Sequence, residues 1–277
     1  MNRLPACLAV VLLLVACATP ATPSSAGASS APPPPIALAS SGRGFGTEHL
    51  VPVEAPPRPD QPILDATFRA ALVDDYCVDR DLAAPAASDP ALTVLDRSYT
   101  LDAGYAPSDL VAASAAGLSA SSGTKLVRAV VVDDLAALVA AARAAGVELG
   151  IESAYRSYAS QAATLDIWTA RLGPAGALLR TARPGHSEHQ LGTAIDFTSP
   201  GWSGRVGDWA TESTEGAWMA EHAWEYGFVM SYPSDAQAES CFAYEPWHYR
   251  WIGREAAAQQ RTAGVGLREF LERYAVP

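Results

Sequence analysis

The chain is organised around residues 184–197, which read PGHSEHQLGTAIDF. His189 and Asp196 are both good ligands for first-row metal ions, and Gly192 lies between them. Because glycine adopts backbone conformations that other residues avoid, the chain can turn back at this point. The imidazole and the carboxylate are therefore predicted to converge on one ion.

A second segment, EPWH at 245–248, supplies a third ligand and a nearby carboxylate. With His248 the set becomes two nitrogens and one oxygen, which is typical of catalytic zinc with an open fourth position. Structural zinc prefers a closed site rich in thiolates. Glu245 is the candidate general base that activates water. These residues predict a hydrolase with one Zn²⁺ ion, and the same donors also accept other divalent ions.

Each of these residues also has a purely structural interpretation. Glu245 could pair with Arg250 or Arg254 at the surface, and either histidine could be a core residue bonded to the backbone. Asp196 could cap a turn. However, residues 193–197 alternate so that Asp196 points the same way as Ala194. A lone carboxylate in so apolar a strand would be costly, which favours metal binding.

Three ordered blocks of sequence carry a resemblance to a known family. They are SAYRSYASQ at 153–161, SEHQLGTAID at 187–196 and EPWH at 245–248. Together these blocks resemble the VanY-like D-alanyl-D-alanine carboxypeptidases, which are LAS-type metallopeptidases. Agreement of three blocks in order is far more specific than any one of them. The similarity covers the second half of the chain and continues more weakly back to residue 92.

The resemblance implies a fold and a reaction. The fold is a single hedgehog/D,D-peptidase-like domain of the α+β class, with a mostly antiparallel central sheet flanked by helices, and the alternation of predicted elements agrees with it. The reaction is removal of the terminal D-alanine from peptidoglycan stem peptides. Alternatives are a peptidoglycan D,D- or L,D-endopeptidase, a D-Ala-D-Ala dipeptidase, or a non-catalytic module that binds the cell wall.

The resemblance also assigns roles outside the metal set. Arg156, always charged and planar, is expected to contact substrate near the scissile bond, where it suits a carboxylate or an oxyanion; its structural alternative is an ion pair. Ser187 and Gln161 are expected to hydrogen-bond the carboxyl-terminal residue of the substrate. Trp247 is expected to pack beneath the site and to orient Glu245 and His248.

Composition limits the class of protein. The chain has 277 residues, of which 49% are hydrophobic, and it contains seven tryptophans. Such a chain can bury a substantial core. Its formal net charge of -11 offers no electrostatic reason to bind nucleic acid.

The amino-terminal region predicts export. Residues 1–16 combine a short positive start with an apolar core too short to span a bilayer, as in signal peptides. The sequence LVAC at 14–17 resembles a lipoprotein processing box, so Cys17 is expected to carry lipid; the alternative is ordinary secretory cleavage near Ala18 or Ala21. Residues 17–62, rich in Ala, Ser and Pro, are predicted to be a disordered tether, and residues 63–277 the zinc domain. We therefore expect a membrane-anchored lipoprotein outside the cytoplasm, at the cell surface or in the periplasm.

The remaining cysteines and histidines complete the prediction. Cys77 and Cys241 are left as a pair in an oxidising compartment, so a disulfide is expected. It would tie the amino-terminal region to the loop before Glu245. His186 lies too close along the chain to His189 for both to be assigned as ligands. His222 lies in a tryptophan-rich helical segment, where packing is the better explanation.

Periodicity predicts several elements. Helices are expected over 65–75, 133–145, 157–171, 215–226, 255–262 and 267–274, and strands over 147–153, 193–197 and 228–232. Asp133 and Ser157 are the expected amino-terminal caps of two of these helices. Ile167 is expected to be partly buried, together with Leu165 and Trp168.

Overall fold

The computed structural model describes residues 77–84, 90–202 and 208–275. The predicted export signal, the lipidation site Cys17, the tether and the helix at 65–75 lie outside these residues, so they stay predictions. Within the described ranges, no helix combines the length and the hydropathy needed to cross a bilayer.

A five-stranded sheet lies at the centre of the described residues, with strand order β4-β6-β7-β9-β8. Its strands are β4 Ser119–Ala120, β6 Gly150–Ser153, β7 Ala194–Thr198, β8 Phe228–Met230 and β9 His248–Trp251. Within this sheet only β4 and β6 pair in parallel, and the other neighbours are antiparallel. The sheet is therefore mostly antiparallel, as predicted. Two short pairs accompany it, β1 Leu82–Ala83 with β2 Tyr99–Thr100, and β3 Leu110–Ala112 with β5 Leu126–Arg128.

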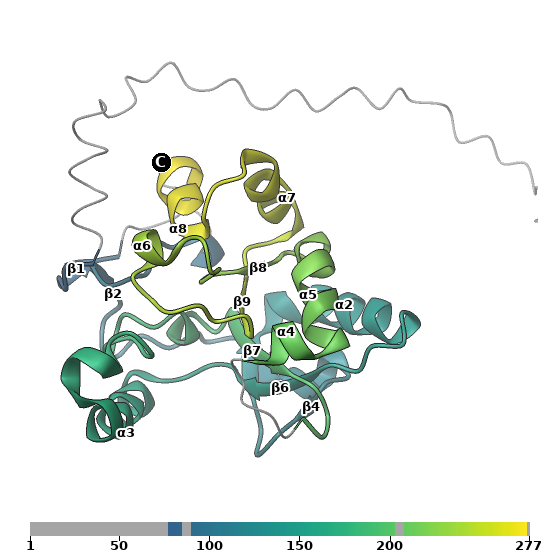
Figure 1. The fold of residues 1–277 in the computed structure, drawn as a ribbon, viewed down its shortest axis with the longest axis horizontal. Helices are drawn as coiled ribbons and strands as arrows, with labels where there is room; N and C mark the ends of the chain where they lie inside the picture. Colours follow the sequence, from purple (N-terminus) through teal and green to yellow (C-terminus); the bar gives the residue numbers. More distant parts are fainter. Residues whose placement is uncertain (1–76, 85–89, 203–207, 276–277) are drawn as a thin grey trace, which may run out of the picture. The chain divides into compact units, whose positions relative to one another are not determined.

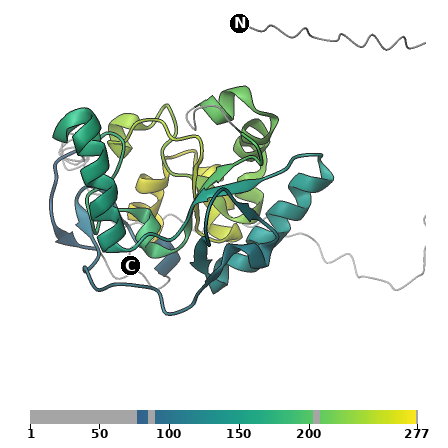
Figure 2. The ribbon, with the colours of Figure 1, turned by 90° about the horizontal axis from the view of Figure 1, so that it is seen from below.

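Helices flank this sheet, which confirms the predicted α+β class. The α-helices are α2 Val132–Ala144, α3 Tyr158–Ala177, α4 Trp209–Glu212, α5 Thr214–His222, α6 Gln237–Ser240, α7 Arg254–Ala263 and α8 Leu267–Phe270. A π-helical turn, Leu271–Ala275, follows α8. Short 3-10 helices cover Pro90–Leu92, Ala113–Ala116, Ala129–Val131, Glu188–Leu191 and Ala223–Tyr226. In both Figure 1 and Figure 2, α2 and α3 lie on opposite sides of the sheet.

The main core covers one face of the sheet. Helix α2 buries a stripe with helical spacing, made of Leu135, Leu138, Val139 and Ala142. The stripe belongs to the same buried cluster as Ile195, Phe197 and Tyr249 from β7 and β9. Side chains alternate along a strand. The opposite face of β7 and β9 is therefore left to Asp196, His248 and Arg250.

Local predictions were mostly correct, with two corrections. Ser157 caps α3 by accepting a hydrogen bond from the backbone N–H of Ser160, and Gly173, at φ 74°, interrupts the helix where the predicted helix ended.

Asp133 does not cap α2; the helix begins one residue earlier, and Asp133 lies in its first turn. Ile167 is 52% exposed rather than partly buried, because α3 buries only Gln161 and Ala177.

Candidate metal centre and active site

Strands β7 and β9 bring two of the predicted ligands together. Their antiparallel register sets Asp196 opposite His248 and Ala194 opposite Arg250. All four side chains are therefore on the face turned away from the α2 core. Ala194 is fully buried beside the ligand. A larger side chain at that position would occupy the space into which the ligands converge.

His189 reaches the same place from a tight turn. It lies in the 3-10 helix Glu188–Leu191, which ends at Gly192 with φ 74°. A Cβ atom at Gly192 would lie 2.9 Å from Cγ of Arg128. Both the positive φ and this close approach require glycine. The predicted turn between the two ligands is therefore present, and its cause is steric as well as conformational.

The three predicted ligands form one buried cluster. Asp196 Oδ2 lies 3.2 Å from His189 Nε2, and Asp196 Oδ1 lies 2.9 Å from His248 Nδ1. One donor atom from each residue lies within 4.8 Å of the other two. Nδ1 of His189 is buried and has no hydrogen-bond partner. Two imidazoles and one carboxylate that converge in a buried site fit the donor preferences of zinc.

The electrostatics of this cluster favour a cation. Burial acts to raise the pKa of Asp196, but His189 and His248 hold that pKa well below its usual range. Burial acts to lower the pKa of His248, but hydrogen bonds to Asp196 and Glu188 raise it to about 10. Burial lowers the pKa of His189. Asp196 thus stays ionised. Because a histidine must be neutral to bind a metal, a metal ion bound here would displace a proton from His248.

Glu245 lies at the turn that leads into β9. Its backbone C=O accepts a hydrogen bond from the N–H of His248, and its side chain is 9% exposed. Burial raises the pKa of Glu245 to about 8, and charges on His248, Asp196 and Arg156 also act on it. A carboxyl group with a pKa near neutrality is suited to take up and return a proton.

Among the residues that the structure describes, neither ion pair expected as the structural alternative for Glu245 is present. Arg250 pairs with Glu188, and Arg254 pairs with Asp134. Both arginines expected as surface partners of Glu245 are thus engaged with other carboxylates. This leaves the buried carboxyl group of Glu245 available for chemistry.

Arg156 is held in the loop between β6 and α3. Its Nη1 donates to Gln161 Oε1 and its Nη2 donates to Ser153 Oγ, each at 2.9 Å. Gln161 is fully buried, and its Nε2 donates to Thr181 Oγ1 and to the backbone C=O of Ala182. The amide of Gln161 thus serves to hold Arg156, and its contact with substrate stays a prediction.

Comparison with known proteins agrees with this geometry. The family model VanY, D-alanyl-D-alanine carboxypeptidase, matches residues 124–254. The carboxypeptidase homologue YodJ of Bacillus subtilis is 31% identical over 183 residues, which cover 66% of this chain and 67% of that protein. The chain belongs to the VanY D-alanyl-D-alanine carboxypeptidase family. A D-alanyl-D-alanine carboxypeptidase of Enterococcus faecalis is 34% identical over 140 residues, which cover 47% of this chain and half of that enzyme.

Solved structures of VanY-like peptidases share the fold. The LD-carboxypeptidase LdcB is 31% identical, with a TM-score of 0.59, over 65% of this chain and 85% of that one. VanYB in complex with D-alanine-D-alanine is 28% identical, with a TM-score of 0.56, over 66% and 98%. A VanY mutant in complex with Zn(II) is 29% identical, with a TM-score of 0.56, over 66% and 99%. This chain is thus a VanY-family peptidase with a buried His/Asp/His metal site.

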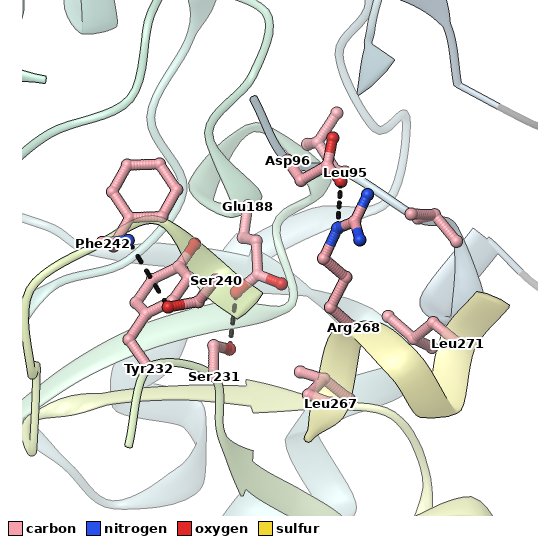
Figure 3. A pocket seen from close by; sticks show the side chains of 11 residues that line it. Leu95, Asp96, Glu188, Ser231, Tyr232, Ser240, Phe242, Leu267, Arg268 and Leu271 are labelled. Carbon is pink, nitrogen blue, oxygen red and sulfur yellow. Dashed lines mark hydrogen bonds and ion pairs between the residues drawn. The ribbon is translucent and has the colours of Figure 1, made fainter. Parts of the chain in front are cut away.

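Sequence reasoning missed Glu188, which lies between Ser187 and the ligand His189. Its Oε2 lies 2.9 Å from His248 Nε2 and accepts from Ser231 Oγ at 2.6 Å, and its Oε1 accepts from Arg250 Nη1 at 2.9 Å. Figure 3 shows Glu188 and Ser231 at the wall of a cavity of about 20 Å³, room for about one water molecule. The sequence signal that could have identified Glu188 is its position directly before the ligand His189.

Other predicted residues of this VanY-family site take the following positions. Ser187 is 5% exposed and directly precedes the 3-10 helix that carries His189, and its substrate contact stays a prediction. Trp247 is partly buried against the main core. Its backbone C=O accepts from the N–H of Phe197, which ties the turn containing Glu245 to β7.

The expected disulfide is present and borders the segment that leads to Glu245. Cys77 and Cys241 are bonded, across 164 residues of sequence.

His186 and His222 both lie outside the metal cluster, as predicted. His186 contacts the backbone C=O of Asp96, and His222 packs against Trp218.

Proposed function

We propose that this chain is a zinc-dependent D-alanyl-D-alanine carboxypeptidase that removes the terminal D-alanine from peptidoglycan stem peptides. The observation that carries the proposal is the buried cluster of His189, Asp196 and His248 on a VanY-family fold. The similar VanYB is bound to D-alanine-D-alanine, and a similar VanY mutant binds Zn(II). His189, Asp196 and His248 would hold one zinc ion.

The residues around the cluster suggest how the peptide bond is cleaved. A bound zinc ion would supply Lewis acidity for a peptide carbonyl and for water. Glu245, with its pKa near 8, takes the proton of the attacking water and returns it to the amine of the departing D-alanine. Arg156 grips a carboxylate or the developing oxyanion of the substrate with its fixed planar charge. Gln161 and Ser153 hold the guanidinium in position.

A second candidate function is an L,D-carboxypeptidase. It is favoured by the likeness to the LD-carboxypeptidase LdcB, which has a TM-score of 0.59 at 31% identity. Both activities use the same metal site and differ in the residue that precedes the terminal D-alanine. A non-catalytic wall-binding module is disfavoured, because it would not need the buried carboxyl group of Glu245.

Stem peptides of defined length distinguish these functions. The zinc-loaded protein is incubated with a pentapeptide ending in D-alanyl-D-alanine and with the tetrapeptide that lacks the last residue, and free D-alanine is measured. We expect release from the pentapeptide, and a loss of at least about 10²-fold in Glu245→Gln with zinc still bound. Release from the tetrapeptide alone would establish the L,D-activity instead. Cleavage of cross-linked dimers, detected by mass analysis of muropeptides, would show an endopeptidase, and no cleavage in any assay would indicate a binding module.

A further inference from the structure

Both ring nitrogens of His248 face a carboxylate. Nδ1 lies 2.9 Å from Asp196 Oδ1, on the side of the metal cluster, and Nε2 lies 2.9 Å from Glu188 Oε2, on the opposite side. Tyr232 stacks on the ring, with centroids 4.9 Å apart at an interplanar angle of 27°. The ring is therefore fixed in plane and in rotation by groups from three different segments.

The carboxylate of Glu188 is itself fixed by burial and by hydrogen bonds. It is 4% exposed, and both of its oxygens accept hydrogen bonds, from Arg250 Nη1 and from Ser231 Oγ. Arg250 is fully buried, and its Nη2 donates to the backbone C=O groups of Ala91 and Thr93. A negative acceptor is thus built at a fixed point behind His248.

We infer that Glu188 is a positioning residue for the metal site, because it holds the proton of His248 on Nε2 so that the lone pair of Nδ1 faces the metal. The inference rests on the proposed zinc site. Metal-binding histidines commonly donate their second N–H to a carboxylate, which fixes the tautomer and makes the ring a better ligand. Here that carboxylate directly precedes another ligand, His189, in the sequence. One short segment thus supplies one ligand and orients a second.

The substitution Glu188→Gln tests this role with little change in shape. If the new amide NH₂ faces Arg250, two donors oppose each other. If it faces His248, Nε2 must accept a hydrogen bond, and the ring proton moves to Nδ1, where it blocks the lone pair meant for the metal. Either arrangement weakens the site. Loss of such a partner typically lowers metal affinity by about 10- to 100-fold, and we expect a loss in that range.

Zinc affinity is measured by competition with a chromophoric chelator, and the tautomer is read from ¹⁵N-labelled histidine by NMR of the zinc-loaded protein. The matched control is Asp96→Asn. Asp96 is also buried, lines the same cavity and is paired with an arginine, Arg268 (Figure 3), but it makes no side-chain contact with a ligand in the described residues. We expect the control to lose stability while keeping the zinc affinity of the unmodified protein.

The outcomes separate the inference from the function on which it rests. Unchanged zinc affinity in Glu188→Gln would overturn the inference alone. If that variant fails to fold, the spectrum of the unmodified protein decides, since a His248 proton on Nδ1, or a metal bond through Nε2, would also overturn it. Failure of the unmodified protein to bind zinc would overturn the proposed function first. An equal loss of affinity in Asp96→Asn would assign the effect to general destabilisation.

Discussion

The metal cluster and Arg156 are held by different means, although both belong to one site. Asp196 and His248 lie on paired strands, where backbone register sets their spacing and an apolar layer supports the reverse face. Arg156 lies in a loop. Its backbone N–H donates to the C=O of His189, and only its guanidinium is held by side-chain hydrogen bonds, to Ser153 and Gln161. Metal binding should therefore be as robust as the core sheet, whereas the position of the guanidinium, to which we assign the grip on substrate, should be open to change by a side-chain substitution.

The largest expected effect comes from the layer behind the metal cluster. Phe197 is fully buried and meets the rings of Phe228 and Tyr249 edge-on, each at 5.9 Å. Phe197→Ala should lower the free energy of unfolding by about 3–5 kcal/mol, through lost burial and a new cavity. Urea denaturation of the metal-free protein measures this change in the free energy of unfolding. Zinc affinity of the folded fraction should stay unchanged, and a large fall in that affinity would show that register alone does not place the ligands.

The metal cluster was largely predictable because the sequence patterns that indicate it are local. Alternation within 193–197 places Asp196 on one face of its strand, and the motif spacing supplies His189 and Gly192. Glu188 could not be assigned in this way, since its partners His248 and Arg250 lie 60 and 62 residues further along the chain. An acidic residue in sequence alone looks like a solvated one. Its burial beside a ligand follows from its hydrogen bonds to His248 and Arg250 of β9.

The next largest effect is on the pH dependence of stability, and it distinguishes Glu245 from the metal ligands. Burial raises the pKa of Glu245 from 4.5 to about 8 in the metal-free protein. Between these values the folded state keeps a proton that the unfolded state releases, so stability falls as pH rises through this range. Glu245→Gln removes this penalty. At pH 7 the metal-free variant should be more stable than the unmodified protein by about 3 kcal/mol, since each pH unit corresponds to about 1.4 kcal/mol.

The comparison uses urea denaturation in the presence of a chelator, from pH 4.5 to 8. His248, with its pKa raised to about 10, also contributes stability that is lost with rising pH. That loss occurs in both proteins and cancels in their difference. The two proteins should be equally stable at the acid end of the series. A stability difference that does not change with pH would mean that Glu245 is already ionised in the folded protein.

The Arg156 half was predicted less completely, because side-chain networks carry no periodic signal. The family resemblance predicted that both Arg156 and Gln161 contact the substrate. The sequence did not predict that Gln161 is fully buried, with its amide hydrogen-bonded to Arg156, Thr181 and Ala182. A residue in the first turn of α3 faces inward or outward according to how the helix docks, and the apolar pattern of α3 is too weak to fix this.

The smallest expected effect tests whether the two halves are independent. Gln161→Met keeps the volume of the side chain but removes the acceptor that holds Arg156 Nη1. A hydrogen bond to a charged group contributes about 1.5 kcal/mol or more, so KM for the pentapeptide should rise by roughly tenfold, with a smaller change in kcat. Zinc affinity should not change, because in the described structure Gln161 makes no hydrogen bond to His189, Asp196 or His248. If zinc affinity falls together with substrate affinity, the substrate grip and the metal cluster form one mechanical unit, and the contrast between a sheet-held half and a side-chain-held half fails.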